Sequence, residues 1–445
     1  MKQSHSTGTP KPRHALAFAL AVLATGALVA ACQQTPTDTA SSPTAAESPA
    51  GTTSTGGLKL GALLPATGDL SSIGQPMLKA LPLLVETVNA CGGVNGEPVT
   101  LVIEDDQTDP AAGTEAMTKL TEADKVNAVV GAFASSVSTA ALDVAVRNQV
   151  PMISPGSTSP VFTERAKKGE FQGFWARTAP PDTYQAAALA KLAIDKGLTN
   201  VSTVVINNDY GVGFEKAFVA EFEKLGGTVL NKANPTRYDP KGTTFDTEAA
   251  AAFNPGGQKP DAVVAVLYAE TGSILLKAAY EQGLTDGVQV LLTDGVQTEE
   301  FPQDVGKRAD GSFILSGALG TVPGAGGPAL ADFTKLWQEK EGSAPGAFVP
   351  HTWDAAALLV LAAQAAGSND SVAIRDKLRE VASGGETVTD VCQGLALLRE
   401  GKDINYDGAS GKVDIDENGD VVGNYDVWTV NDQGKIDVID QVTLN

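Results

Sequence analysis

The stretch from Gln149 to Pro160 reads Gln-Val-Pro-Met-Ile-Ser-Pro-Gly-Ser-Thr-Ser-Pro. Its apolar part is typical of a buried strand, and the small polar residues that follow are typical of a loop. Gly156 has no Cβ, and Ser157 and Thr158 place hydroxyl groups beside backbone N–H groups. Such a loop suits a small anion, above all a carboxylate, held by hydrogen bonds. The alternative is a plain connection from a strand to a helix, in which the hydroxyl groups only cap the helix.

Strands and helices are predicted to alternate on both sides of this stretch, which is typical of an α/β fold with parallel sheets. The rhythm breaks at residues 174–181 and then starts again, so the sequence predicts two such domains. The expected strands are 58–64, 99–103, 126–130 and 150–153, then 201–206, 261–267 and 288–292. Further along, we expect a strand at 313–316, a β-hairpin at 413–430 and a last strand at 435–442.

The amino-terminal segment is expected to lie outside the fold. A basic start and an uncharged apolar run end at Ala31, and the pattern indicates a secretory signal peptide over residues 1–31. Cys32 follows at once and resembles the acylated cysteine of bacterial lipoproteins; an uncleaved membrane anchor is the alternative. Residues 32–57 then form a disordered tether that begins with this lipidated cysteine. Both readings place the body outside the cytoplasm and hold it at a membrane.

Charge and cysteine content narrow the class of protein further. The formal net charge is −21. All charged side chains of the predicted leader are basic, so the mature chain has a still more negative net charge. This balance argues against a nucleic-acid partner. Cys91 and Cys392 remain as an even pair in an oxidising compartment, so one disulfide is expected. Two separate buried thiols are the alternative.

Polar and aromatic residues follow the expected strands, where open α/β sheets bind their ligands. The first series offers neutral hydrogen-bond donors that suit a carboxylate. The second offers aromatic rings and carboxylates that suit an ammonium group and an apolar side chain. Together they suit a zwitterionic amino acid. The residues are Ser135, Gly156, Ser157 and Thr158 in the first series, and Tyr210, Tyr268, Glu270 and Asp294 in the second.

Five motifs together resemble one known family. They are Gly-Ala-Leu-Leu-Pro-Ala-Thr-Gly-Asp at 61–69, Glu-Asp-Asp-Gln-Thr-Asp-Pro at 104–110, Met-Ile-Ser-Pro-Gly-Ser-Thr-Ser-Pro at 152–160, Asn-Asp-Tyr-Gly-Val-Gly at 208–213 and Leu-Thr-Asp-Gly at 292–295. The chain resembles the periplasmic leucine/isoleucine/valine-binding proteins, which are type I substrate-binding proteins of ABC importers. The resemblance implies two Rossmann-like lobes joined by three crossovers, closing on an amino acid. We expect residues 58–180 and 318–411 in the first lobe, and residues 181–317 and 412–445 in the second.

The resemblance also assigns roles to individual residues. Ser135 and the loop from Gly156 to Thr158 would hold the α-carboxylate, and Tyr210 would match the family's tyrosine. Asp294 would hold the ammonium group, where the leucine-type proteins have Glu. Ile73 stands where they have an aromatic residue. Because of these two departures, we expect a broader preference among neutral amino acids, with the branched-chain type included.

The expected partners follow from the same resemblance. A monomeric, lipid-anchored receptor would deliver its ligand to a membrane permease and ATPase. A ligand-sensing module for a membrane receptor, or a binder of a small amide or urea, remains the alternative. No cofactor, metal or enzymatic activity is expected.

Three other signals carry less weight. His351 is the only histidine after the leader, and no Gly-x-Ser-x-Gly elbow accompanies it, which argues against a catalytic triad. Residues 414–419 match half of a calcium loop, but the final Glu is missing, so a hairpin turn is the better interpretation. Arg177 is expected in a structural ion pair, with an acidic ligand side chain as the alternative.

Overall fold

The computed structural model describes residues 57–442. The predicted signal peptide, the lipidated Cys32 and the tether up to residue 56 lie outside the described residues. Within them, no single helix is long and apolar enough to cross a membrane; only the bent pair of helices at Val349–Ala366 and Ser371–Val381 meets that test, by length and composition alone.

The first sheet has five strands, all parallel, in the order β2-β1-β3-β4-β5. Its strands are β1 (Lys59–Leu64), β2 (Thr100–Asp105), β3 (Ala128–Gly131), β4 (Met152–Ser154) and β5 (Trp175–Arg177). Most of its residues are buried on both faces, as expected for a parallel sheet covered by helices. The helices between these strands are α1 (Ser71–Ala90), α2 (Pro110–Thr118), α3 (Ser135–Arg147) and α4 (Val161–Lys167), with a short π-helix at Lys119–Ala123 after α2.

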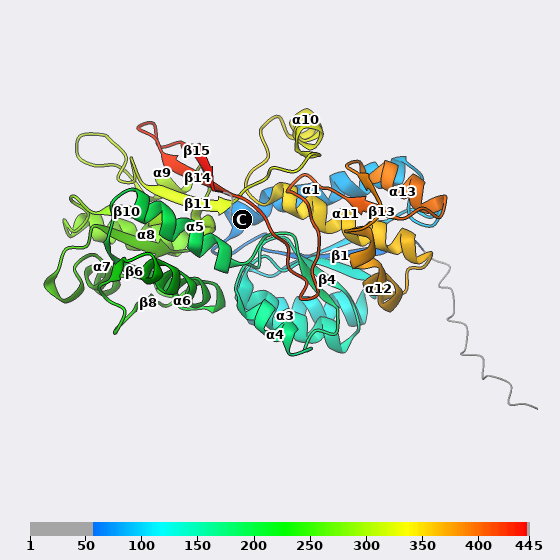
Figure 1. The fold of residues 1–445 in the computed structure, drawn as a ribbon, viewed down its shortest axis with the longest axis horizontal. Coiled ribbons are helices and arrows are strands. Elements are labelled where there is room, and N and C mark those ends of the chain that lie inside the picture. Colours follow the sequence, from blue (N-terminus) through cyan, green and yellow to red (C-terminus); the bar gives the residue numbers. More distant parts are fainter. Residues whose placement is uncertain (1–56, 443–445) are drawn as a thin grey trace, which may run out of the picture. The chain divides into compact units, whose positions relative to one another are not determined.

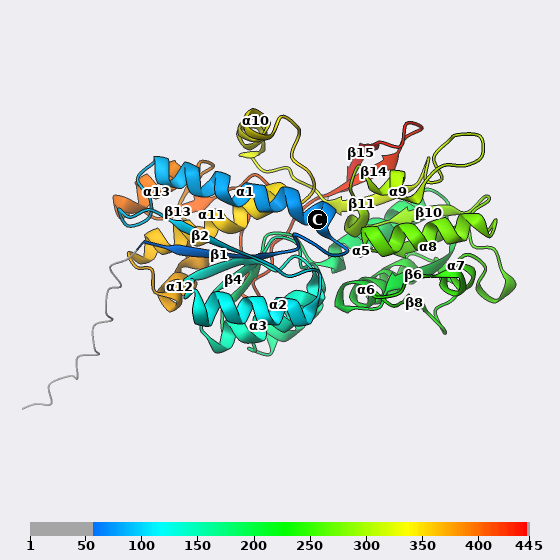
Figure 2. The same cartoon turned by 180° about the vertical axis from the view of Figure 1, so that it is seen from behind.

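Three helices from the far end of the chain complete this lobe. They are α11 (Val349–Ala366), α12 (Ser371–Val381) and α13 (Val391–Arg399). Figures 1 and 2 both show α11 and α13, in yellow-orange and orange, beside the blue helix α1, and α12 next to α11. Helix α11 is apolar around its whole circumference and almost fully buried, because it packs on α1 and on strands β3 and β4 at once. Helix α10 (Leu330–Glu341) and the small parallel pair β12 (Glu386–Val388) and β13 (Ile404–Tyr406) flank these helices in the sequence.

The second sheet has eight strands, in the order β15-β14-β11-β10-β9-β6-β7, with β8 also paired to β6. All pairs are parallel except those that involve β14 and β15. The strands are β6 (Asn200–Ile206), β7 (Thr228–Val229), β8 (Thr236–Tyr238), β9 (Ala262–Val266), β10 (Gln289–Leu292), β11 (Leu319–Pro323), β14 (Tyr425–Val430) and β15 (Ile436–Val442). The accompanying helices are α5 (Asp182–Asp195), α6 (Asp209–Lys224), α7 (Asp246–Phe253), α8 (Ala269–Glu281) and α9 (Phe301–Val305), with 3₁₀ turns at Pro255–Gly257 and Asp294–Val296. Two mainly parallel sheets confirm the predicted fold class.

Three details of the prediction need correction. Strand β11 pairs with β10 and β14, so it belongs to the second sheet, and residues 318–323 were assigned to the wrong lobe. The antiparallel hairpin is formed by β14 and β15, not by residues 413–430. Residues 314–316 form turns rather than a strand, and Phe313 makes an isolated bridge with Lys307. The last two errors share a cause: a short apolar run does not say which distant strand it pairs with.

The predicted disulfide is present between Cys91 and Cys392, whose Cα atoms are 5.9 Å apart. Cys91 follows the last residue of α1, and Cys392 lies in the first turn of α13. The bond therefore ties α1, the first helix within residues 57–442, to one of the last helices of the same lobe.

Candidate functional site

Five of the nine predicted ligand residues line one small cavity, whose volume is about 10 Å³. This is room for about one water molecule. Strand ends of both sheets contribute, as is usual where open α/β sheets bind ligands. The lining residues are Leu70, Phe133, Ala134, Ser135, Gly156, Tyr210, Tyr268, Asp294 and Gly295.

The first-lobe wall of the cavity is built from the loop after β4 and the amino-terminal end of α3. Ser154 donates a hydrogen bond of 2.6 Å to the Ala132 carbonyl and accepts from the N–H groups of Gly156 and Ser157. The N–H of Ser159 donates to Oγ of Ser135 at 3.3 Å. These bonds fold the loop tightly against the start of the helix.

The hydroxyl group of Ser157 does not point into the cavity. It contacts the carbonyls of Ala132 and Phe133 and, at 2.8 Å, Oγ of Ser138. The side chain of Ser157 therefore fastens the loop and is not a free donor for a ligand, contrary to the prediction. Thr158 is buried beneath the cavity, and its hydroxyl lies beside the carboxyl group of Asp182.

Arg177 supports the same loop from below. Its guanidinium donates to the carbonyls of Ser157 and Ser159 at 2.9 and 3.0 Å, and it forms a salt bridge with Asp420. The side chain is fully buried. The predicted structural ion pair is thus confirmed. It lies where the first connection between the two lobes contacts the third connection, which is residues 416–424.

The second-lobe wall carries a buried carboxyl group. Oδ1 of Asp294 accepts hydrogen bonds from the Tyr210 hydroxyl at 2.9 Å and from Nε2 of Gln185 at 2.8 Å. Burial raises the pKa of Asp294 to about 6, against these two hydrogen bonds, which lower it. Tyr210 stacks on Tyr268, with ring centroids 5.7 Å apart. The cavity is therefore aromatic on one side and acidic at its base.

A second buried carboxyl group, Asp182, lies beside Asp294. Burial raises its pKa well above the ordinary value, and the nearby negative charge of Asp294 raises it further. Its backbone N–H donates to the Thr158 carbonyl at 2.8 Å, which ties the start of α5 to the loop of the first lobe. The positive charge of Arg177 lowers the pKa of Asp182 only in part. A further cation would reduce the cost of charging both carboxyl groups in this desolvated site.

Sequence reasoning missed Asp182. It follows Pro180 and Pro181 at the start of a helix, where an acidic residue is ordinary. The sequence offered one signal for Asp182, namely its position in the first connection between the lobes, because such a connection runs beside the cleft.

Two predicted residues lie elsewhere. Ile73 is buried in α1 and lines a different cavity of about 530 Å³, while Leu70 takes the expected place beside the ligand cavity. Glu270 is exposed and lines a larger cleft of about 750 Å³, which shares Tyr268 with the small cavity.

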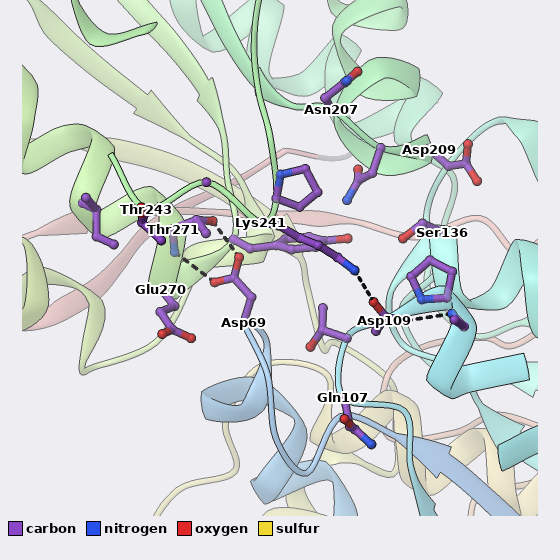
Figure 3. Close-up of a pocket in the computed structure, with 18 residues that line it drawn as sticks. Asp69, Gln107, Asp109, Ser136, Asn207, Asp209, Lys241, Thr243, Glu270 and Thr271 are labelled. Atoms are coloured by element: carbon purple, nitrogen blue, oxygen red, sulfur yellow. Dashed lines mark hydrogen bonds and ion pairs between the residues drawn. The ribbon is translucent and has the colours of Figure 1, made fainter. Parts of the chain in front are cut away.

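Figure 3 shows this larger cleft, with side chains from both lobes around it. Two contacts cross it. Asp69 of the first lobe accepts hydrogen bonds from Thr271 of the second, and Lys241 forms a salt bridge of 2.8 Å with Asp109. The amino-terminal ends of α2, α3, α6 and α8 meet around the cleft.

His351 and the acidic side chains among residues 57–442 bear on whether the protein holds a catalytic or metal site. Burial lowers the pKa of His351 to about 3, so the imidazole is neutral at physiological pH. Among residues 57–442, no group of three or more His, Cys, Asp or Glu side chains is arranged to hold a metal ion. The acidic residues at 414–420 form a turn in which Asp416 accepts from the N–H groups of Asn418 and Asp420.

A protein-family match covers residues 76–433 and carries the description "Receptor family ligand binding region". The chain belongs to this family. The Leu/Ile/Val-binding proteins are among its matches, as the sequence motifs predicted, and the family is one of non-enzymatic binding proteins. The chain is a substrate-binding protein of the kind that serves ABC transporters, and the family is periplasmic or extracellular.

Two curated relatives illustrate the range of the matches. The chain is 27% identical over 383 residues to the "Chemotactic signal transduction system substrate-binding protein BasB" of Halobacterium salinarum, covering 84% of this chain and 87% of the relative. It is 28% identical over 335 residues to "Leu/Ile/Val-binding protein homolog 2" of Brucella abortus, covering 74% and 84%.

Solved structures agree with the fold. A leucine binding protein, LivK, from Thermotoga maritima matches with a TM-score of 0.72 and 26% identity, covering 87% of this chain and 99% of that one. LivJ from Streptococcus pneumoniae, in complex with isoleucine, matches with a TM-score of 0.70 and 22% identity, covering 87% and 100%. A solute binding protein from R. palustris, in complex with benzoate, matches with a TM-score of 0.67 and 20% identity, covering 88% and 98%.

Proposed function

We propose that this protein captures a free amino acid of the neutral or branched-chain type and delivers it to an ABC permease. The observation that carries the proposal is a pair of buried carboxyl groups: Asp294, which lines the cavity, and Asp182, whose pKa the charge of Asp294 raises. An α-ammonium group would pair with Asp294 and offset the negative charge of both. The start of α3 with Ser135 and the backbone of the loop at Gly156 line the same cavity from the other lobe and suit the α-carboxylate. Thr158, whose hydroxyl lies beside Asp182, would support this loop.

The acid pair favours an amino acid over an aromatic acid. A benzoate-type ligand brings a carboxylate and no cation, so it would leave two buried carboxyl groups uncompensated. The names of several relatives and the isoleucine in the LivJ complex point the same way. Asp294 is one methylene shorter than the Glu that the resemblance assigns here, which supports a wider range of neutral side chains than branched-chain ones alone.

Capture would work by closure of the two lobes. Each half-site by itself leaves the ligand charges exposed to water, whereas closure removes water and pairs each charge with a fixed dipole or an opposite charge. A micromolar ligand supplies about 8 kcal/mol to divide between closure and binding. The closed form is then what the permease would recognise, and acylation of Cys32 would keep the monomeric receptor at the membrane, outside the cytoplasm.

A sensing role is the second candidate, favoured by one observation. BasB, the chemotactic substrate-binding protein, is among the similar relatives and matches over most of both chains. The same amino-acid trap could report its ligand to a membrane receptor. Transport and sensing share the binding step, so a test of ligand identity bears on both.

A thermal-shift screen of the mature protein tests the binding step. The panel contains all amino acids, small amides, urea and benzoate. A ligand at 100 times its Kd stabilises the protein by about 2.7 kcal/mol, and this stabilisation raises the melting temperature that the screen measures. We expect neutral amino acids to give the largest shifts. A shift with benzoate or urea and none with any amino acid would overturn the proposal.

A further inference from the structure

Asp69 of the first lobe caps a helix of the second. Helix α8 begins at Ala269, and its own cap residue, Tyr268, makes no side-chain hydrogen bond there. Instead, the carboxylate of Asp69 accepts hydrogen bonds from the backbone N–H of Thr271 at 3.0 Å and from its Oγ1 at 2.6 Å. An aspartate that accepts from the third N–H of a helix performs the ordinary role of an N-cap, and its charge suits the helix dipole. Here the cap is supplied across the cleft.

This contact is joined directly to the ligand cavity. Asp69 precedes Leu70, which lines the cavity. On the other side, the Tyr238 hydroxyl lies 3.3 Å from Oγ1 of Thr271 and accepts from the backbone N–H of Tyr268 at 3.1 Å. The cap thus adjoins one cavity residue in each lobe, so its geometry depends on how the lobes meet around a ligand.

The second contact across the cleft is weaker. Lys241 and Asp109 form their salt bridge in solvent, with the lysine side chain 78% exposed. Asp109 is also the cap of α2 within its own lobe, so it keeps its helix partners when Lys241 moves away. An exposed ion pair of this kind contributes little. Asp69, in contrast, is partly buried and accepts two hydrogen bonds from Thr271.

We propose that the contact between Asp69 and Thr271 is a closing clasp that forms when the lobes close and sets how readily the amino acid is retained. The proposal rests on the proposed function and adds to it a positioning residue outside the ligand cavity. Any contact made only in the closed form shifts the open–closed equilibrium and therefore the apparent affinity. Loss of an N-cap of this type corresponds to an affinity loss of about 2- to 30-fold.

The charge of Asp69 distinguishes two substitutions. Burial raises the pKa of Asp69, more than its hydrogen bonds to Thr271 lower it, and the nearby Glu270 raises it further. Closing the clasp therefore costs the charged form of this side chain part of its hydration. In Asp69→Asn, the amide oxygen still accepts from the Thr271 N–H, and its nitrogen donates to Oγ1, which donates in turn to Tyr238. We expect Asp69→Asn to keep the affinity and Asp69→Ala to lose it.

A double-mutant cycle separates closure from ordinary helix stability. Affinity for the amino acid found by screening is measured by calorimetry for Asp69→Ala, Thr271→Val and the double variant, beside the free energy of unfolding without ligand. We expect each single variant to bind more weakly and the double variant to bind no more weakly than Asp69→Ala alone. Lys191→Ala, which breaks an exposed ion pair within α5, is the matched control and should bind normally.

A distance measurement tests the clasp independently of ligand identity. Labels at exposed positions of the two lobes, Arg379 on α12 and Lys277 on α8, report the separation of the lobes in the full mature chain. We expect Asp69→Ala to shift the ligand-free population toward larger separations and to reduce the change on adding ligand. Unaltered separations, or equal losses of ligand affinity and ligand-free stability, would overturn the clasp. Absence of binding by every amino acid, with the separations still shifted, would instead count against the proposed function alone.

Discussion

The hydroxyl group of Tyr210 donates a hydrogen bond of 2.9 Å to Oδ1 of Asp294, and both side chains are buried. The bond fixes the carboxyl group in one orientation at the base of the cavity, with Gln185 holding the same oxygen from α5. A carboxyl group that is buried and held in one orientation beside a cavity is well suited to an incoming cation.

The first prediction concerns the charge of Asp294. In Asp294→Asn the shape and both hydrogen bonds are kept, but the charge that would pair with an ammonium group is lost. A charge-assisted hydrogen bond contributes about 1.5–3 kcal/mol, so we expect affinity to fall by about 10- to 150-fold in calorimetry. The ligand-free variant should be no less stable at pH 7.5, because the substitution removes a buried charge whose pKa is raised.

Asp310→Asn is the control for this variant. Asp310 is an exposed carboxylate of the second lobe that bonds only to its neighbour Ser312. It should bind ligand normally. Equal affinities for Asp294→Asn and wild type would remove Asp294 from the ammonium site.

A second prediction follows from the raised pKa values of the acid pair. In the ligand-free protein Asp294 has a pKa of about 6, and that of Asp182 is raised as well. A ligand ammonium favours the ionised carboxylates and lowers both pKa values, so binding releases protons. The affinity should therefore fall as the pH drops through the pKa of Asp294 at about 6, by up to tenfold per pH unit for each proton released.

Calorimetry in two buffers of different ionisation enthalpy measures this release of protons directly.

The stability of the ligand-free fold depends on pH in the opposite direction. A carboxyl group whose pKa is raised in the folded state stabilises the ligand-free protein at low pH, and this contribution is lost as the pH rises through about 6. Affinity that stays constant from pH 7.5 to 5 would contradict the ammonium assignment.

Sequence patterns located the cavity because its residues follow strands. Buried apolar runs that end in glycine, serine or aspartate are visible in the sequence, and parallel strands bring their carboxyl ends to one edge. Ser135, Gly156 and Asp294 were found in this way. The direction of a side chain is a different matter, because a hydroxyl group in a loop can face a ligand or its own backbone. Ser157 shows this, since its Oγ is directed to the carbonyls of Ala132 and Phe133.

The errors all depend on contacts that are distant in the sequence. The role of Asp182 in the site depends on its proximity to Asp294, which is distant in the sequence. Strand β11 was placed in the wrong lobe because one of its partners, β14, is far away in the sequence. Between β11 and β14 the chain returns to the first lobe, while the other partner, β10, precedes β11. Ile73 and Leu70 lie three positions apart at the start of α1, and their helical register decides which of them reaches the cavity.

The disulfide supplies a third prediction. The bond closes a loop with a sequence separation of 301 residues, for which the loop-entropy argument gives about 6 kcal/mol and measured disulfides give typically 2–4 kcal/mol. We expect the variant with Cys91→Ala and Cys392→Ala to lose about 2–5 kcal/mol of unfolding free energy in denaturant titrations.

Ligand affinity should be unaffected by this change. Helix α1 begins near the cavity at Ser71 and runs for 20 residues, or about 30 Å, before it reaches Cys91. Calorimetry on the double variant is the check, and a large loss of affinity would show that the bond also constrains the lobe around the ligand.

The last prediction concerns the close approach of backbone and ring at Gly156. A Cβ at this position would lie 2.1 Å from Cε2 of Phe133. The ring cannot easily yield, because it packs edge-on against Phe348 with centroids 4.9 Å apart. Both Gly156 and Phe133 line the cavity. In Gly156→Ala, we expect the loop to move away from the ring, at a cost of about 1–3 kcal/mol in stability, and with it the backbone that faces the ligand carboxylate.

Affinity for the amino acid should then fall by about tenfold or more, because a small displacement of hydrogen-bond donors is costly in a desolvated site. Gly326→Ala is the matched control, since a Cβ there meets nothing within 4 Å. Calorimetry and denaturant titration on both variants give the two quantities separately. If Gly156→Ala loses stability but binds the amino acid as wild type does, the loop at Gly156 supports the fold and the carboxylate must be held by the amino-terminal end of α3 and Ser135 instead.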